Sequence, residues 1–164
     1  MGARKKGGGQ TPATVAAAKA GVAFTLHPYE VEHGVDDYGA KVADALGVAR
    51  ERLFKTLIAV VDEEPTVGMV PVCGALDLKA LAAATGGKRA RMAEAETAER
   101  LTGYVVGGIS PLGQRRRLPA VLDESASGFD TIFVSAGRRG LQIELAPADL
   151  VRLTGAALAP IARR

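Results

Sequence analysis

Short runs of apolar residues, separated by glycine, proline and charged residues, organise this chain. Two of them, 53–61 and 67–72, flank the polar segment 62–65 and predict two strands joined as a hairpin. Apolar or β-branched residues also dominate shorter runs, which predict strands at 22–29, 118–122, 131–135 and 141–145. The pattern is that of a sheet built from several short strands.

Five further segments carry helix signals. Thr11-Pro12 is typical of an N-cap followed by proline in the first turn, so a helix is predicted over 12–20, ending at Gly21. Similar start and stop residues predict helices at 40–46, 77–84, 93–101 and 146–153. Helices and strands do not alternate regularly. The predicted fold class is therefore α+β, with a mixed, largely antiparallel, curled sheet and helices packed outside it.

The composition is that of one folded domain. The chain has 164 residues, of which 48% are hydrophobic, and this is enough to form a full core. We expect residues 1–10 to form a flexible basic tail and residues 11–164 to form the domain. No apolar run approaches the ~18 residues of a membrane span, and the N-terminus lacks the apolar segment of a secretory signal. A cytoplasmic protein without membrane contact is expected.

Candidate chemistry centres on the segment Gly103–Arg117. Val105-Val106, which we expect to be the end of a short strand, precedes Gly107-Gly108, and arginines 115–117 close the segment. Backbone N–H groups at a glycine-rich strand end, next to fixed positive charge, suit an anionic ligand or a developing oxyanion. A tight turn followed by a solvated basic loop is the other interpretation. The segment alone does not decide between them.

Lys55 and two tyrosines are further candidates for a binding site. Lys55 interrupts an apolar strand, so its side chain either reaches water at an edge or serves a pocket. Tyr29 and Tyr38 suit stacking on a base or a ribose, and equally suit two half-buried positions in the core. Residues 88–91 are expected to be a solvated strand edge, and 136–140 a turn rich in glycine and arginine.

Neither a metal nor a cofactor is expected. His27 and His33 lack a clear third ligand, and the glycine-rich motifs that bind ATP or dinucleotides do not occur. Cys73 ends the returning strand of the hairpin and has no basic neighbour in sequence that would form its thiolate. We expect Cys73 to be buried as a small hydrophobic residue.

Several blocks, in order from about residue 11 to the C-terminus, carry a family resemblance. The most specific are Lys55-Thr56-Leu57 and the segment Gly107–Gly113, which reads Gly-Gly-Ile-Ser-Pro-Leu-Gly. The others are Thr11-Pro12-Ala13, His27-Pro28-Tyr29-Glu30, Leu76-Asp77-Leu78-Lys79 and Ser135–Leu145. With these blocks the chain resembles the YbaK/EbsC family, and within it the Cys-tRNA(Pro) deacylases. The same fold forms the editing domain of bacterial prolyl-tRNA synthetases.

The resemblance implies an activity. That activity is trans-editing, in which the protein hydrolyses the aminoacyl ester of tRNA(Pro) that prolyl-tRNA synthetase has mischarged with cysteine. The implied chemistry is attack by the thiol of the substrate on its own ester, while the protein orients the ester and stabilises the oxyanion. The implied partners are the 3′ end of mischarged tRNA(Pro) and prolyl-tRNA synthetase.

The resemblance also implies roles for individual residues. Lys55 contacts the tRNA end near the ester, and the N–H groups of Gly107 and Gly108 hold the ester carbonyl. Tyr29 and Tyr38 are the pocket aromatic residues, and Ser135 lies near the sulfhydryl group. The remaining implied substrate-binding residues are Thr56, Ile109, Ser110 and Gln142. Some relatives have aspartate at the position of Gln142, so no role that needs a carboxylate is expected there.

Two other classes of function stay open. The same fold can act on another mischarged tRNA, such as Ala-tRNA(Pro), and the size and polarity of the pocket around Ser135 and Gly107 decide between such substrates. The chain can also be a non-catalytic module that binds tRNA or the synthetase. The net charge of +3 permits nucleic-acid binding without indicating it.

Overall fold

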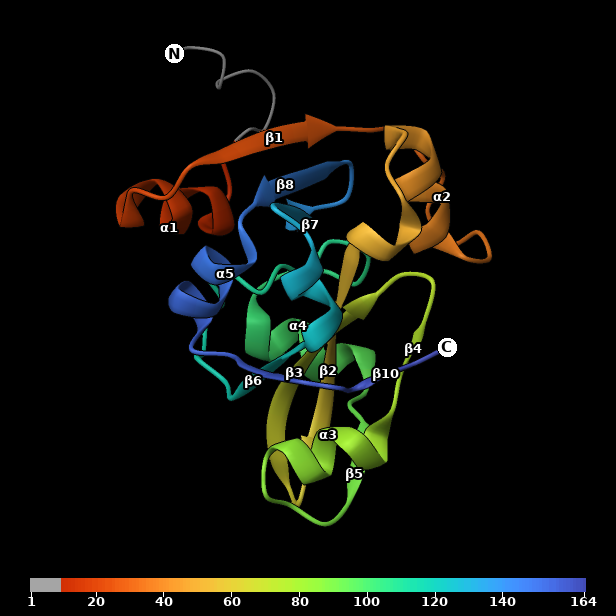
Figure 1. Cartoon of the computed structure of the whole chain (residues 1–164), viewed down its shortest axis with the longest axis vertical. Coiled ribbons are helices and arrows are strands. Elements are labelled where there is room, and N and C mark those ends of the chain that lie inside the picture. Colours follow the sequence, from red (N-terminus) through yellow and green to blue (C-terminus); the bar gives the residue numbers. More distant parts are fainter. Residues whose placement is uncertain (1–9) are drawn as a thin grey trace.

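The structure is a computed structural model that describes residues 10–164. The expected basic tail lies outside the described residues, except for Gln10. In the described part, the strands form two main sheets, with helices packed around them (Figure 1). None of the described helices is both long and apolar enough to cross a membrane.

The larger sheet has five strands in the order β5-β2-β3-β6-β9. Its centre is the antiparallel hairpin of β2 (Phe54–Val61) and β3 (Glu64–Pro71), which pair along their whole length. The strands that complete it are β6 (Ala120–Asp123), parallel to β3, β9 (Ala157–Ala159), parallel to β6, and the antiparallel edge strand β5 (Ala90–Met92). The sheet is therefore mixed.

The second sheet is antiparallel, in the order β1-β8-β7. Its strands are β1 (Phe24–Pro28), β7 (Ile132–Arg138) and β8 (Leu141–Leu145). A single parallel bridge between Leu53 and Phe133 joins the two sheets next to the start of β2. A short pair of strands, β4 (Ala75–Leu76) and β10 (Ala162–Arg163), holds the C-terminal segment.

Capping residues mark the ends of most of the helices. The helices are α1 (Pro12–Ala20), α2 (Tyr38–Leu46), α3 (Leu78–Ala84), α4 (Ala95–Thr102) and α5 (Pro147–Thr154), with short 3₁₀ turns at Arg50–Arg52 and Glu124–Gly128. Thr11 caps α1 by accepting the N–H of Thr14, and Asp77 caps α3 by accepting that of Ala80. Helices α1 and α2 lie at the end of the molecule formed by the smaller sheet, and α3 lies at the other end (Figure 1).

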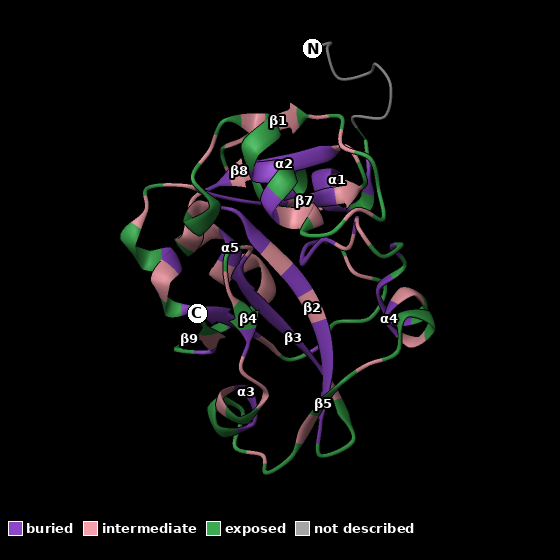
Figure 2. Cartoon of the chain, turned by 90° about the vertical axis from the view of Figure 1, so that its right-hand side faces the viewer, coloured by how far each residue is buried: buried purple, intermediate pink, exposed green. Residues whose placement is uncertain are grey.

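The core fills the space between the two sheets. Phe54 and Met69 from the larger sheet and Ile143 from the smaller one belong to its main cluster. The β2–β3 hairpin is buried along most of its length, whereas α3 and α4 expose one face (Figure 2). A smaller cluster packs Val42 of α2 against Leu53 and Phe133, and thereby fixes α2 over the junction of the sheets.

The predicted α+β class is confirmed, and three local expectations are wrong. Val105-Val106 is not a strand end, because the chain turns there after α4. Residues 136–140 are not all turn, because β7 continues to Arg138 through an irregularity after Ser135. Cys73 is exposed and not buried, because β3 ends at Pro71 and Cys73 lies in the turn that follows.

Candidate functional site

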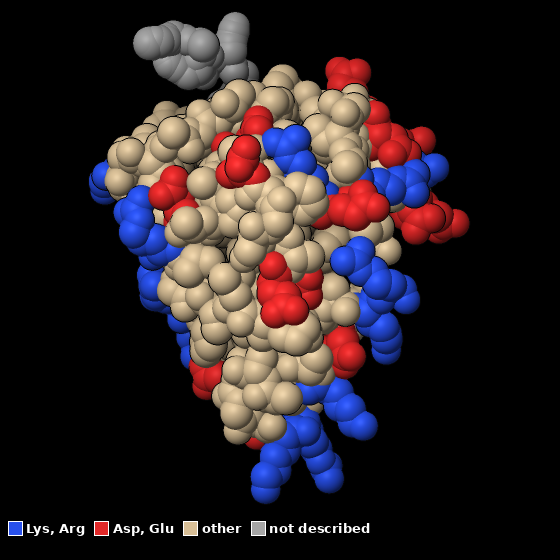
Figure 3. Space-filling view, viewed as in Figure 1, with Lys and Arg blue, Asp and Glu red and all other residues tan. Residues whose placement is uncertain are grey.

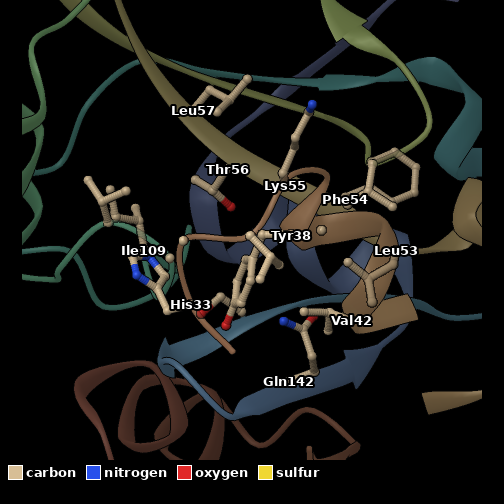
Figure 4. A pocket seen from close by; sticks show the side chains of 17 residues that line it. His33, Tyr38, Val42, Leu53, Phe54, Lys55, Thr56, Leu57, Ile109 and Gln142 are labelled. Atoms are coloured by element: carbon tan, nitrogen blue, oxygen red, sulfur yellow. The ribbon is translucent and has the colours of Figure 1, made fainter. Parts of the chain in front are cut away.

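A cavity of about 330 Å³ opens where α2, the start of β2 and the smaller sheet meet. Its walls come from the segment before α2, from α2, from Leu53–Leu57, from the turn at Val106–Ile109, and from one residue each of β7 and β8 (Figure 4). Pockets of this size hold small ligands or the end of a larger one. The cavity therefore combines residues from across the chain.

Strand β2 contributes two neighbouring residues with different surroundings. Thr56 is buried, and its hydroxyl has no hydrogen-bond partner among the described residues. Lys55 is half-buried and has no ion pair within the described part of the chain. In Figure 4 its ammonium group points away from Tyr38 and Gln142. A cation and an unpaired hydroxyl thus border the same cavity.

Strands β7 and β8 contribute a directly paired Ser135 and Gln142. The Ser135 hydroxyl accepts the N–H of Gly137 at 3.1 Å. Gln142 is 5% exposed, and its side-chain carbonyl oxygen has no partner among the described residues. A buried polar group without a partner is costly, and both such groups on this cavity, in Gln142 and Thr56, lie where a ligand would meet them.

The glycine pair forms a tight turn and not a strand end. The N–H of Gly108 donates to the carbonyl of Val105 at 2.8 Å, and Gly107 has a φ of 94°, as the third position of a type II turn requires. Gly108 is buried, and a Cβ there would lie 2.7 Å from the backbone of Arg138. Gly107 lines the cavity, and its N–H has no acceptor among the described residues. Only one of the two N–H groups is therefore free.

The two tyrosines meet, but they do not both line the cavity. Their hydroxyl groups are 3.1 Å apart. Tyr38 borders the cavity, and Tyr29 is not among the lining residues. Burial raises the pKa of Tyr38, and the hydrogen bond with Tyr29 raises it further. His33 also borders the cavity, with its ring edge-on to Tyr38 at 5.3 Å between ring centres. Sequence reasoning weighed His33 only as a metal ligand and missed this position.

The structure thus gathers most of the implied site and leaves three residues outside it. The cavity is bordered by Lys55, Thr56, Tyr38, Gly107, Ile109, Ser135 and Gln142. The lining does not include Tyr29, Gly108 or Ser110. Ser110 is fully buried, and its hydroxyl accepts the N–H of Leu112, so its role in this structure is to shape the turn.

The two histidines have separate surroundings. His27 pairs with Glu144 at 2.8 Å, away from the cavity that His33 borders. In residues 10–164 no group of three or more His, Cys, Asp or Glu side chains is arranged to hold a metal ion. Exposed Cys73 is also absent from the cavity lining, and its sulfur lies 3.6 Å from the guanidinium of Arg164.

Comparisons with known proteins identify relatives of this chain. A profile of the aminoacyl-tRNA editing domain matches residues 32–153. The chain is 42% identical over 135 residues to EbsC of Enterococcus faecalis, a candidate Cys-tRNA(Pro)/Cys-tRNA(Cys) deacylase, over 81% of this chain and 82% of that protein.

Two solved structures share the fold. A candidate trans-editing enzyme for prolyl-tRNA synthetase superimposes with a TM-score of 0.82 at 25% identity, over 93% of this chain and 96% of that one. A hypothetical protein superimposes with a TM-score of 0.83 at 25% identity, over 93% of this chain and all (100%) of that one. Because the family profile covers most of the chain and EbsC is similar over nearly the same span, the chain belongs to the aminoacyl-tRNA editing domain family.

Proposed function

We propose that this protein is a trans-editing deacylase that hydrolyses Cys-tRNA(Pro). The observation that carries the proposal is the cavity bordered by Lys55, Gly107 and Gln142, in a chain of the editing family. Lys55 supplies a cation for the terminal nucleotide, and the free N–H of Gly107 supplies a donor for the ester carbonyl. The names of EbsC and of the trans-editing enzyme support the same substrate class.

The nucleophile in this proposal belongs to the substrate. Thr56 and Ser135 are the hydroxyl-bearing residues that border the cavity beside Tyr38, and within residues 10–164 neither is hydrogen-bonded to a side chain that would act as its base. The cysteinyl sulfur attacks its own ester carbonyl. A C–S bond forms, the bond between the carbonyl carbon and the ribose 3′ oxygen breaks, and the proton of the thiol goes to that leaving oxygen. Water then opens the resulting thiolactone to free cysteine. Because the reacting groups are already joined, the protein needs only to fix their geometry.

Recognition of the tRNA body is assigned to the synthetase. Basic side chains gather at the end of the molecule that carries α3 and β5, and along both edges of the face in Figure 3, with acidic side chains between them on the rest of that face. The α3–β5 end is also the far end of β2 from Lys55, since Val61 and not Lys55 pairs with β5. Because the net charge of the chain is only +3, we assign to the protein the aminoacyl-adenosine end, and to prolyl-tRNA synthetase the choice of tRNA.

One set of deacylation assays tests the proposal. We expect Cys-tRNA(Pro) to be hydrolysed fastest, and Ala-tRNA(Pro), Pro-tRNA(Pro) and Ser-tRNA(Pro) slowly, because alanine and proline lack the thiol and serine has a weaker nucleophile of nearly the same size. Equal rates for the serine and cysteine esters would exclude thiol assistance. Preferred hydrolysis of the alanine ester would identify the protein as a deacylase of Ala-tRNA(Pro). If no ester were hydrolysed, the protein would be a non-catalytic module that binds tRNA or the synthetase.

A second comparison tests whether the synthetase and not this protein selects the tRNA. We expect the isolated protein to hydrolyse Cys-tRNA(Pro) and Cys-tRNA(Cys) at similar rates, and added prolyl-tRNA synthetase to favour Cys-tRNA(Pro). Strong discrimination by the isolated protein would assign tRNA recognition to this chain.

A further inference from the structure

Arg139 reaches across the site to the turn that carries Gly107. Its side chain leaves the turn between β7 and β8, and both Nε and Nη2 donate to the carbonyl oxygen of Val106, at 2.9 and 2.8 Å. The two residues are 33 positions apart in the chain. A two-pronged contact from a planar guanidinium fixes the direction of its acceptor as well as its position.

The carbonyl that Arg139 holds belongs to the same peptide unit as the free N–H of Gly107. A cation that hydrogen-bonds the oxygen of an amide draws charge from that amide and makes its N–H a stronger donor. On the other side of Val106, its own N–H donates to Oε2 of Glu99 at 2.8 Å. Arg139 of the β7–β8 turn thus holds the Val106–Gly107 peptide itself, and Glu99 of α4 holds the preceding Val105–Val106 peptide.

The packing around Gly107 leaves no room for a side chain. A Cβ at this position would lie 2.9 Å from Nε of Arg139 and 2.8 Å from the ring of His33, and the φ of 94° also favours glycine. Any larger residue would therefore have to displace the guanidinium that holds the peptide. The contact between Arg139 and the Val106 carbonyl therefore requires glycine at position 107.

We propose that Arg139 is a positioning residue that aims and polarises the N–H of Gly107 toward the carbonyl oxygen of the bound ester. The inference rests on the proposed deacylase function, which supplies the ester. Arg139 touches neither the ester nor the sulfur in this arrangement. It acts through the peptide, so its loss lowers the rate of the chemical step more than it weakens binding.

The competing role for an exposed arginine at a tRNA site is a phosphate contact. The two roles predict different results. A phosphate contact acts mainly on KM, depends on salt, and is largely kept by lysine because the charge remains. A two-pronged hold on one carbonyl acts on kcat and is lost in Arg139→Lys, since an ammonium group lacks the planar fork.

The experiment compares Arg139→Gln and Arg139→Lys with Arg115→Gln as the matched control. The structure leaves Arg115, which sequence analysis placed beside a possible anion site, outside the residues that border the cavity. Arg115 is also exposed and donates to a backbone carbonyl, that of Arg100 at 3.4 Å, and not to the Val106–Gly107 peptide. We expect both Arg139 variants to lose about 10- to 100-fold in kcat, less than the roughly 10²–10³-fold lost when an oxyanion donor is itself removed. We expect KM to change little, and Arg115→Gln to keep the wild-type kcat.

A second readout does not need activity. In ¹⁵N–¹H spectra of the free protein, the Gly107 amide should shift and exchange with solvent differently in Arg139→Gln, and stay unchanged in Arg115→Gln. If the wild-type protein hydrolyses no ester but the Gly107 amide responds, the proposed function fails and the role of Arg139 in setting this peptide stands. An unchanged Gly107 amide, or a raised KM that Arg139→Lys restores, would overturn the inference.

Discussion

The hydroxyl groups of Tyr29 and Tyr38 lie 3.1 Å apart, so that one phenol donates a hydrogen bond to the other. Tyr38 borders the cavity, and Tyr29 is not among the lining residues but contacts Tyr38 through this hydrogen bond. Because burial and the neighbouring hydroxyl both raise the pKa of Tyr38, it stays protonated beyond the ordinary phenol value of about 10. Tyr38 is therefore available as a neutral donor or stacking surface, and not as a base.

Variants of the two tyrosines should show that Tyr38 contacts the substrate and that Tyr29 supports Tyr38. We expect Tyr38→Ala to lower kcat/KM by tenfold or more, equivalent to at least about 1.4 kcal/mol of binding lost in the transition state. Tyr29→Phe removes one hydrogen bond, so it should cost about 0.5–1.5 kcal/mol of folding free energy and leave kcat/KM within about threefold of wild type. Steady-state deacylation and urea unfolding measure both effects. A larger loss of activity in Tyr29→Phe would place Tyr29 against the substrate.

Lys55 should position substrate without forming a covalent bond. Lys55→Ala should remove most deacylation, because the cavity then has no cation for the terminal nucleotide. Lys55→Arg should keep part of the activity, since the charge survives while the shape changes. Treatment with borohydride during turnover provides the check, and a substrate adduct trapped on Lys55 would disprove the positioning role.

Replacing the polar end of Gln142 should make the protein more stable and less active. Its buried carbonyl oxygen has no partner in the described structure, and leaving such a group unpaired costs roughly 1–3 kcal/mol. Gln142→Met has a similar shape, so we expect a higher free energy of unfolding together with a higher KM. Thermal or urea unfolding alongside deacylation kinetics measures the trade-off. A destabilised Gln142→Met protein would show that the oxygen is already satisfied in solution, by water.

Cys73 should be dispensable for hydrolysis. It lies in an exposed turn outside the cavity lining, so its thiol has no route to the ester. Cys73→Ser should hydrolyse Cys-tRNA(Pro) at nearly the wild-type rate, and a thiol reagent that modifies the free protein at Cys73 should also leave the rate unchanged. A folded but inactive Cys73→Ser variant would falsify the mechanism based on the thiol of the substrate.

The carboxylate of Asp123 should make the free energy of unfolding fall at acidic pH. Burial alone would raise the pKa of its carboxyl group, but hydrogen bonds from Ser125, Ala162 and Ile161 outweigh burial and lower it. A lowered pKa stabilises the fold above the unfolded value of about 3.9, and this stabilisation is lost as pH falls through the lower folded value.

The matched variant for this effect is Asp123→Asn, which keeps the shape and removes the charge. It should unfold at lower urea concentration than wild type at pH 7, and the difference should shrink as pH falls below about 4. If the two proteins kept the same difference in unfolding free energy from pH 7 to pH 2, the charge of Asp123 would not be its source.

Elements set by local residues were predictable from the sequence. The proline after Thr11 and the glycine at 21 mark the ends of α1, and the β8 range 141–145 follows from strict alternation. The β2–β3 hairpin was predicted from two apolar runs around the polar segment 62–65, although β3 begins at Glu64, before its apolar run. The family blocks then indicated part of the cavity lining, including Lys55, Gly107 and Gln142.

Features set by distant residues were not predictable in this way. The turn at Val105–Gly108 looks like a strand end in sequence, and its shape depends on Glu99 and on Arg139, which lies after β7. The place of His33 depends on how the segment before α2 folds against Tyr38, for which the sequence offers no periodic signal. The exposure of Cys73 depends on where pairing in β3 ends.

The position of β8 at the centre of the smaller sheet has a consequence during translation. Among the described strands, β1 pairs with β8 alone, so its hydrogen-bonding edge has no partner strand from residues 10–140 until residues 141–145 have been synthesised. The same strand brings Gln142 to the cavity. A ribosome that stops before this point therefore releases a chain with an open edge and without a complete site, and synthesis must pass residues 141–145 before the editing site can form.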